Sequence, residues 1–270
     1  MCRHLAYLGA PRYLADLVLT PKHGLLRQSY QPRDMRGGAT INADGFGVGW
    51  YPLSGLRAGR LPVRYRSSRP LWADESFAQI ASATEACGVL AAIRSATEGM
   101  ALVHTACAPF TEGRWLFSHN GVVTGWPRSV AALAATLPIT DLITLDAPTD
   151  SALLWALARH QLRADVDPAR ALVQLVTAVA DAAPGSRLNL LLTDGATVYA
   201  TAWGHALVSR SSPDGLVVAS ESHDDQPDWI PVPNGYLLFG TAAQGAMIRP
   251  IEGFDRLRPR TLATSRKETP

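Results

Sequence analysis

Lysine is almost absent from this 270-residue sequence, which has 25 basic residues but only two lysines, Lys22 and Lys267. The arginines are scattered, the formal net charge is only +2, and no long basic run occurs. Proteins that bind nucleic acid gather cationic side chains on one face or stripe. We therefore expect no nucleic-acid partner and attribute the arginine preference to coding bias.

Cysteine is scarce as well. Cys2, Cys87 and Cys107 are odd in number and have no short paired spacing, which argues against both a disulfide framework and a zinc site. No apolar run approaches the roughly 18–20 uncharged residues of a membrane span, and the chain does not open on a basic segment followed by a long apolar one. We predict a cytoplasmic protein with no membrane association and no metal.

Nucleotide-binding motifs are missing too. Residues 42–51 are rich in glycine, but the P-loop lysine and hydroxyl residue are absent and the spacing does not fit the dinucleotide fingerprint. We expect no cofactor. Gly45, Gly47 and Gly49 alternate within a strand-like run, which would leave one face of the strand bare for another backbone or a ligand.

The composition indicates a large buried core or an apolar cleft, because hydrophobic residues make up 47% of the chain and charged residues only 18%. The length suits one layered core with elaborations better than two independent domains. We predict a single domain over residues 1–253 and a loose polar tail over residues 254–270.

Periodicity predicts strands first, then two long helices, then more strands, an order typical of an α+β layered domain. Expected strands cover residues 3–8, 63–66, 88–94, 115–118, 122–124, 188–193, 197–203, 207–210, 216–221 and 235–239. Expected helices cover residues 14–19, 25–30, 76–87, 150–162 and 168–183.

Local signals refine this outline. Gly9 and Pro11 are expected to close the first strand, and Cys87 is expected in the core on a helical pattern. Asn120-Gly121 is a strong hairpin signal. Taken alone, it predicts a turn between residues 115–118 and 122–124.

Cys2 stands where removal of Met1 would leave a cysteine at the N-terminus. A free α-amine titrates near ~7.7–8.0, so about a tenth of such amines are neutral at pH 7, whereas a lysine amine with a pKa near ~10.4 is almost fully protonated. The amine of an N-terminal cysteine can therefore take the proton from its own thiol. A chance cysteine at position 2 is the alternative when this residue is considered alone.

Five short motifs occur in order along the first 151 residues. They are Cys2-Arg3-His4, Asp44-Gly45-Phe46-Gly47, Arg94-Ser95-Ala96-Thr97, His119-Asn120-Gly121 and Thr149-Asp150-Ser151. Each is weak by itself, but together they are specific. With them the chain resembles the class II glutamine amidotransferase family of N-terminal-nucleophile hydrolases.

This resemblance implies a four-layer αββα sandwich and covalent catalysis. The mature Cys2 would attack the side-chain carbonyl of a small-molecule γ-glutamyl substrate, and its α-amine would pass the thiol proton to the departing nitrogen. A γ-glutamyl thioester would form and be released by water. The Asn120 side-chain amide and the Gly121 backbone N–H would hold the tetrahedral oxyanion.

The same resemblance assigns the glutamyl recognition site. Arg94 would bind the α-carboxylate through its planar fork, Thr97 would add a hydroxyl to that carboxylate, and Asp150 would bind the α-ammonium. A structural ion pair for Arg94 and a helix cap for Asp150 are the alternatives. His119 is expected to contact substrate or to shape the Asn120 segment, and the mechanism does not need it as a base.

The acceptor of the glutamyl group is expected to be water. Nothing after residue 150 supplies a nucleotide motif or enough chain for a synthase, so a protein partner is not required. The longer matches within the family imply a leaving group with a trimethylammonium and an imidazole. Aromatic faces hold such cations, and the candidates are Trp50, Tyr51, Trp72, Trp115 and Trp126, with core packing as the alternative.

Three other functions stay open. The chain could be a γ-glutamyl peptidase acting on glutathione-like conjugates or a glutaminase subunit that supplies ammonia to a partner. It could also be a non-catalytic relative that binds γ-glutamyl compounds. The sequence assigns no role to Cys107, which lies in a predicted loop.

Overall fold

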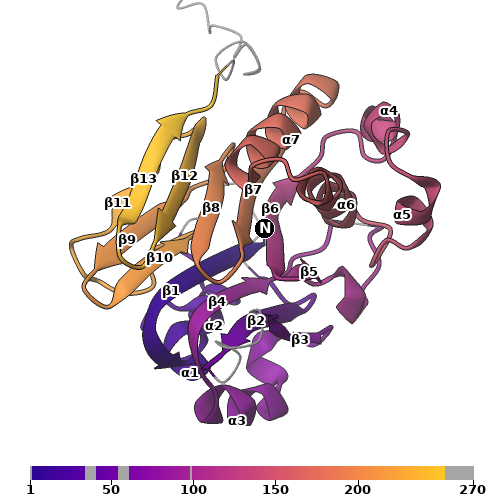
Figure 1. The fold of residues 1–270 in the computed structure, drawn as a ribbon. Coiled ribbons are helices and arrows are strands. Elements are labelled where there is room, and N and C mark those ends of the chain that lie inside the picture. The colour runs from indigo at the N-terminus through magenta and orange to yellow at the C-terminus, as the bar shows by residue number, and fades with distance from the viewer. Residues whose placement is uncertain (1, 34–40, 54–60, 98, 253–270) are drawn as a thin grey trace, which may run out of the picture.

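The computed structural model describes residues 2–33, 41–53, 61–97 and 99–252, and these form two antiparallel sheets that pack face to face (Figure 1). The first sheet has the order β11 (Ile230–Pro231), β9 (Val208–Ser212), β10 (Gly215–Ala219), β1 (Arg3–Tyr13), β4 (Glu85–Ile93), β2 (Phe46–Pro52) and β3 (Val63–Ser67). The second has the order β13 (Gly245–Pro250), β12 (Tyr236–Thr241), β8 (Thr197–Ala202), β7 (Arg187–Thr193), β6 (Trp115–Val122) and β5 (Phe110–Glu112).

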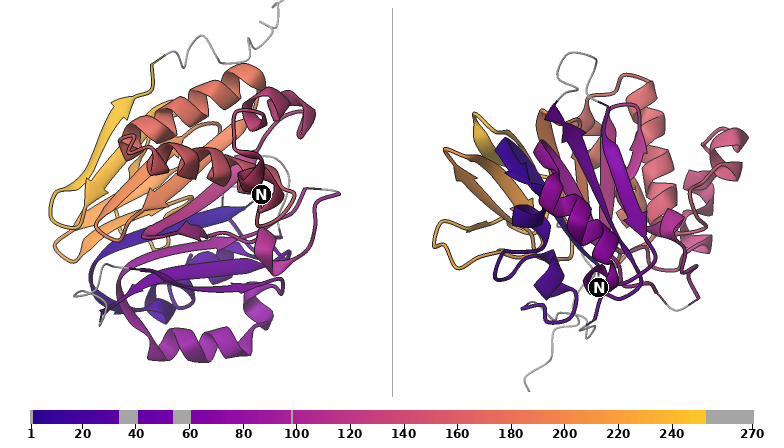
Figure 2. Two further views of the ribbon diagram at one scale, coloured as in Figure 1. Left: turned by 45° about the vertical axis from the view of Figure 1, so that its right-hand side comes forward. Right: turned by 90° about the horizontal axis from the view of Figure 1, so that it is seen from below.

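Helices cover the two outer faces of this pair of sheets (Figure 2). The first sheet carries α1 (Leu14–Val18), α2 (Leu25–Gln28) and α3 (Glu75–Ala83), and the second carries α6 (Asp150–Arg163) and α7 (Pro168–Ala182). Between β6 and α6 lie the short helices α4 (Ala131–Ala134) and α5 (Ile139–Ile143). The predicted four-layer αββα arrangement is confirmed.

Three apolar clusters fill the three interfaces between the layers, as the alternation along β1 illustrates. Leu5 and Tyr7 point to the helices of the first sheet, whereas Ala6 and Leu8 point to the second sheet. Successive side chains of a strand alternate between its two faces, so Cys2 shares the inter-sheet side with Ala6 and Leu8. This parity directs the sulfur toward the second sheet.

The long helices begin where the sequence supplies a cap. Thr149 accepts a hydrogen bond from the Ala152 N–H at the start of α6, and Asp167 accepts one from the Arg170 N–H at the start of α7. Such caps typically contribute about 1 kcal/mol. They fix the N-terminus of α6 beside β6, where the candidate site lies.

The expectation for the alternating glycines is confirmed. A Cβ on Gly47 would lie 2.3 Å from the carbonyl oxygen of Ala108, and one on Gly49 would lie 2.8 Å from the Leu116 side chain. The bare face of β2 therefore lets the segment before β5 approach the strand backbone. This approach places residues 106–108 at the edge of the pocket described below.

Two local predictions are wrong for the same reason, namely that strand pairing continues through a turn signal. β6 runs unbroken through Asn120 and Gly121, which pair with Asn189 and Leu188 of β7, and neither residue has the positive φ that a type I′ turn requires. β1 continues past Pro11 to Tyr13, with a bulge that accommodates the proline.

The remaining differences between the predicted and the observed elements are smaller. Cys87 lies in β4 instead of a helix, because α3 ends at Ala83 and the chain then pairs with β1. The sequence patterns did not indicate β5, β11, β13, α4 or α5. The predicted tail over residues 254–270 lies outside the described residues.

Candidate active site

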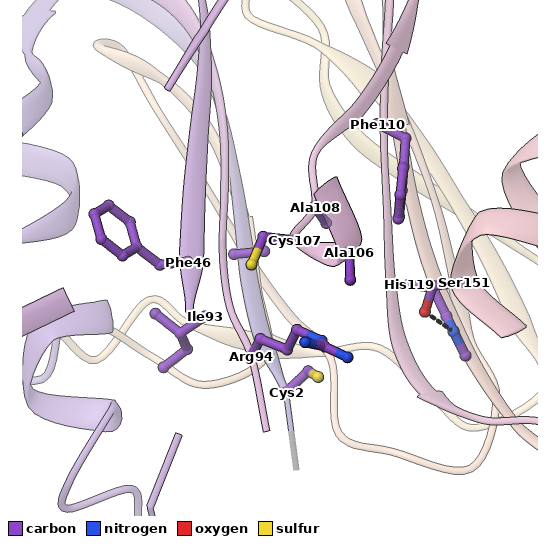
Figure 3. A pocket seen from close by; sticks show the side chains of 11 residues that line it. Cys2, Phe46, Ile93, Arg94, Ala106, Cys107, Ala108, Phe110, His119 and Ser151 are labelled. Carbon is purple, nitrogen blue, oxygen red and sulfur yellow. Dashed lines mark hydrogen bonds between the residues drawn. The ribbon is translucent and has the colours of Figure 1, made fainter. Parts of the chain in front are cut away.

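A pocket opens at the N-terminal end of β1, between the two sheets (Figure 3). Its lining comes from both sheets and from α6: Cys2, Phe46, Ala92, Ile93, Arg94, Ala106, Cys107, Ala108, Phe110, His119 and Ser151. Three of the predicted site residues, Cys2, Arg94 and His119, therefore line one pocket.

Cys2 contacts the chain immediately after β4. The backbone N–H of Ser95 points at Cys2 Sγ across 3.5 Å, and the Ser95 carbonyl oxygen lies 3.6 Å from the same sulfur. The sulfur is thus held against the segment that follows Arg94.

Asp44 fixes that segment. Its carboxylate accepts a hydrogen bond of 2.7 Å from the Ala96 N–H, and its own N–H donates to the Arg94 carbonyl oxygen across 3.1 Å. The peptide of Ser95 is therefore bracketed by two hydrogen bonds to one residue. Asp44 belongs to one of the five motifs, but the sequence alone does not indicate its role.

Arg94 presents its guanidinium to the pocket although only 9% of the residue is exposed. Its Nη1 donates to the Ala101 carbonyl oxygen across 2.9 Å. Within the described residues Arg94 forms no ion pair, so the alternative of a structural pair finds no support there. Most of its donor fork is available to an incoming carboxylate.

Thr97, predicted to assist Arg94, is exposed and is not among the residues that line the pocket. Its carbonyl oxygen accepts a hydrogen bond from the Met100 N–H in the following turn. The structure does not bring its hydroxyl together with Cys2 and Arg94, and its assignment to the carboxylate stays a prediction.

His119 is held at both ring nitrogens. Nε2 lies 2.9 Å from the Arg187 carbonyl oxygen, which can only accept, and Nδ1 lies 2.9 Å from Ser151 Oγ. Nε2 therefore carries the proton, and in the neutral ring Nδ1 accepts from the serine hydroxyl. This arrangement fits a residue that shapes the pocket wall, and Ser151 is a lining residue that sequence reasoning left without a role.

Asp150 is buried next to this pair. Its carboxylate accepts hydrogen bonds from the N–H groups of Val123, at 3.0 Å, and Ser151, at 2.7 Å. Thr149, not Asp150, caps α6. Asp150 does not itself line the pocket, but its neighbour Ser151 does.

Asn120 and Gly121 follow His119 along β6. The Asn120 side chain is buried on the inter-sheet face, where Nδ2 donates to Ser220 Oγ across 3.2 Å. A Cβ on Gly121 would lie 1.8 Å from the Arg187 carbonyl oxygen, so only glycine fits there. Neither residue is in the pocket lining, and their oxyanion role stays a prediction.

Cys107 is a second lining residue to which the sequence alone assigns no role. Its sulfur packs against the Asp44–Gly45 backbone, where a Cβ on Gly45 would lie 2.5 Å away. Burial raises the pKa of the Cys107 thiol to about 11. The thiol is therefore protonated at neutral pH, and no spacing in the sequence could have shown its position.

The aromatic residues at the pocket are Phe46 and Phe110. None of the five predicted cage candidates lines it: Trp50 and Tyr51 are core residues, and Tyr51 donates to two backbone carbonyl oxygens. For Trp50 and Tyr51 the core-packing alternative is therefore correct. Trp115 lines a separate surface depression with Arg114.

The part of the chain that the structure describes contains no group of three or more His, Cys, Asp or Glu side chains arranged for a metal ion. None of its helices combines the length and the apolar character needed to cross a membrane.

The chain belongs to the class II glutamine amidotransferases, whose family model matches residues 26–225. Its two-sheet architecture is the N-terminal-nucleophile hydrolase fold. The γ-glutamyl-hercynylcysteine sulfoxide hydrolase of Mycolicibacterium smegmatis is 44% identical over 238 residues, which cover 88% of this chain and 95% of that protein.

Solved structures agree with this placement. A class II glutamine aminotransferase domain protein from Silicibacter pomeroyi superposes with a TM-score of 0.66 at 26% identity, covering 93% of this chain and 99% of that one. Glutamine phosphoribosylpyrophosphate amidotransferase from Bacillus subtilis superposes with a TM-score of 0.64 at 11% identity. The match covers 93% of this chain but 49% of the Bacillus chain, and it concerns the fold alone.

Proposed function

We propose that this protein is an amidohydrolase that cleaves the γ-glutamyl amide of γ-glutamyl-hercynylcysteine sulfoxide. The products would be glutamate and hercynylcysteine sulfoxide, a step of ergothioneine biosynthesis. The observation that carries the proposal is the shared pocket of Cys2 and Arg94, a nucleophilic sulfur beside a buried guanidinium with no carboxylate partner among the described residues. The similarity to the Mycolicibacterium hydrolase supports the choice of substrate.

In the proposed reaction, removal of Met1 frees the α-amine of Cys2. The amine takes the thiol proton, the sulfur bonds to the γ-carbonyl carbon, and the oxygen of that carbonyl becomes an oxyanion. The Asn120 amide and the Gly121 N–H stabilise this charge, each contributing about 2.7–4 kcal/mol if they act as such donors usually do.

Collapse of the tetrahedral intermediate breaks the C–N bond, and the α-amine returns its proton to the departing nitrogen. A γ-glutamyl thioester on Cys2 remains. Water, deprotonated by the same amine, attacks the thioester and releases glutamate and the thiol. Arg94 holds the α-carboxylate throughout, and Asp150 holds the α-ammonium, with Thr97 and His119 at the edge of the glutamyl group.

We further propose that the enzyme acts in the cytoplasm and needs neither a protein partner nor a cofactor. Residues 1–253 would carry its whole function. The match to a hydrolase over 95% of that protein's length supports water as the acceptor. If the chain were instead a glutaminase subunit that supplies ammonia, a synthase should co-purify with it and stimulate its hydrolysis of glutamine.

The test supplies purified protein with γ-glutamyl-hercynylcysteine sulfoxide, glutamine and glutathione in parallel, and follows glutamate release. The first substrate should be strongly preferred. Preference for glutathione conjugates would move the assignment to a γ-glutamyl peptidase, and hydrolysis of glutamine alone would defeat the pathway assignment.

Intact mass tests the mechanism independently. The protein should lack Met1, and Cys2→Ala should abolish turnover while the unfolding midpoint stays within a few degrees. Retention of Met1 in an inactive protein would favour a γ-glutamyl-binding role over catalysis. Undiminished glutamate release by Cys2→Ala would exclude Cys2 as the nucleophile.

A further inference from the structure

Ser220 connects the strand that carries Cys2 to the strand that carries Asn120. It follows the last residue of β10 and lies opposite His4 of β1. The Ser220 N–H donates to the His4 carbonyl oxygen across 3.0 Å, and Ser220 Oγ accepts from the His4 N–H across 3.0 Å. The residue is 3% exposed, so water does not compete for these bonds.

The same hydroxyl oxygen accepts a second hydrogen bond, from Asn120 Nδ2 across 3.2 Å. One atom thus receives a donor from β1 in the first sheet and a donor from β6 in the second. The other polar atom of the Asn120 side chain, Oδ1, is buried and has no hydrogen-bond partner among the described residues. Within that part of the chain, Ser220 is what orients the carboxamide.

Orientation matters because the torsion that turns an asparagine carboxamide is broad and two-fold, with no steep preference of its own. Nδ2 carries two hydrogens. When one of them is bonded to Ser220, the plane of the carboxamide and the direction of the second hydrogen are fixed. An oxyanion donor must be aimed before the charge develops to be effective.

We propose that Ser220 is a positioning residue for the reaction, which holds the Asn120 amide as an oxyanion donor and ties it to the strand of the nucleophile. The inference rests on the proposed function, because it needs a tetrahedral intermediate formed at Cys2. His4 is two residues from Cys2. The Ser220 hydroxyl oxygen therefore helps to fix both the position of the strand that carries Cys2 and the orientation of the Asn120 carboxamide.

Glu221, the next residue, anchors this segment by itself, so the role of Ser220 can be tested without disrupting the site. Glu221 accepts a 2.8 Å hydrogen bond from Arg3 Nε in a buried ion pair, and its other carboxylate oxygen accepts one from the Arg33 N–H. These contacts hold the segment after β10 independently of the Ser220 hydroxyl. We therefore expect Ser220→Ala to keep the backbone in place and to remove only two hydrogen bonds, those that the hydroxyl accepts from the Asn120 amide and from the His4 N–H.

The experiment is a double-mutant cycle on the full chain with Ser220→Ala, Asn120→Ala and the double variant, read as kcat and KM on the γ-glutamyl substrate. Removal of a single oxyanion donor costs about 10²–10³ in kcat. A misaimed donor should cost less, so we expect Ser220→Ala to lower kcat by about 10-fold to 100-fold with KM changed less than about twofold.

In the Asn120→Ala background the serine change should cost much less than in the wild-type background, because the amide that Ser220 positions is gone and only the hydrogen bond from the His4 N–H remains to be lost. Ser220→Thr, which keeps the hydroxyl, should restore most of the loss. Ser209→Ala, at a buried serine of β9, is the matched control and should behave as wild type. Should Ser220→Ala not fold, Ser220→Cys, with a weaker acceptor of similar size, must show the same kcat-specific loss.

Additive losses in the cycle, or a loss that appears in KM, would overturn the role of Ser220 and leave the proposed function intact. A wild-type protein that does not cleave γ-glutamyl amides would overturn the proposed function, and this inference with it.

Discussion

Nδ1 of His119 and the hydroxyl of Ser151 lie 2.9 Å apart on the wall of the Cys2 pocket. Because Nε2 is bonded to a carbonyl oxygen, the ring has no free nitrogen to accept a proton from Cys2. We therefore predict that His119 shapes the site and that another group transfers the proton.

This relationship predicts a modest effect for Ser151→Ala and a somewhat larger one for His119→Gln, which also removes the hydrogen bond to the Arg187 carbonyl oxygen. A neutral hydrogen bond contributes about 0.5–1.5 kcal/mol, which corresponds to roughly a 2-fold to 13-fold loss of kcat/KM. Steady-state kinetics of both variants give the comparison. A loss above 10³ for the histidine variant with an intact serine variant would instead identify His119 as a general base.

Arg94 should determine affinity for the glutamyl α-carboxylate. A hydrogen bond to a charged group contributes about 1.5–3 kcal/mol, so Arg94→Ala should weaken glutamate binding by about 10-fold to 150-fold. Arg94→Lys should recover only part of this, because an ammonium cannot form the bidentate contact. Calorimetry in the Cys2→Ala background measures binding without turnover.

The matched ligand for that measurement is 4-aminobutyrate, which lacks the α-carboxylate. Its binding should be unaffected by Arg94→Ala. An equal loss for both ligands would show that the variant has disturbed the pocket generally.

Cys107 should be inert although it shares the pocket with Cys2. With a pKa of about 11 caused chiefly by burial, about 0.1% of the thiol is ionised at pH 8. Iodoacetamide followed by peptide mass mapping should label Cys2 and leave Cys107 unmodified. The same protection should persist in Cys2→Ala, and labelling of Cys107 in that variant would show that competition, and not burial, had shielded it.

Acid should destabilise the fold through two buried histidines. Burial lowers the pKa of His4 to about 3 and that of His223 to about 4, whereas an unfolded histidine titrates near ~6.5. Below pH 6.5 the unfolded chain therefore binds protons that the folded chain does not, and the free energy of unfolding falls as the pH falls. Each histidine should remove about 2 kcal/mol between pH 8 and pH 5.

Urea unfolding at the two pH values measures this loss. His223→Asn removes one of the two groups and should roughly halve the difference, while its stability at pH 8 reports any packing defect against Trp229 separately. An undiminished pH dependence in the variant would assign the acid sensitivity to other groups.

The sequence was most informative where a residue type is needed for a physical reason. Alternate glycines predicted a bare strand face, and Gly47 and Gly49 are indeed contacted by the 108–116 segment. The long helices were recognisable from their caps and apolar periodicity, and both begin at the predicted residues.

Prediction failed where a neighbouring strand overrides a local signal. Asn120-Gly121 has the composition of a turn, yet β7 pairs with both residues and keeps β6 extended. Thr97 follows Arg94 by three residues, but its side chain is exposed and does not line the pocket, so its assignment to the carboxylate stays a prediction. The places of Cys107, Ser151 and Ser220 depend on contacts between segments far apart in the chain, for which one sequence offers no signal.

The contact between the N-terminal strand and Ser220 also has a consequence for biosynthesis. Cys2, the proposed nucleophile, is among the first residues to leave the ribosome. Ser220 and Glu221, which hold its strand through His4 and Arg3, are synthesised only after most of the chain. At about 5–20 residues per second, the interval is roughly 10–45 s. In the proposed mechanism, trimming of Met1 can thus precede assembly of the pocket, and the reactive terminal cysteine would be exposed before the enzyme that uses it has folded.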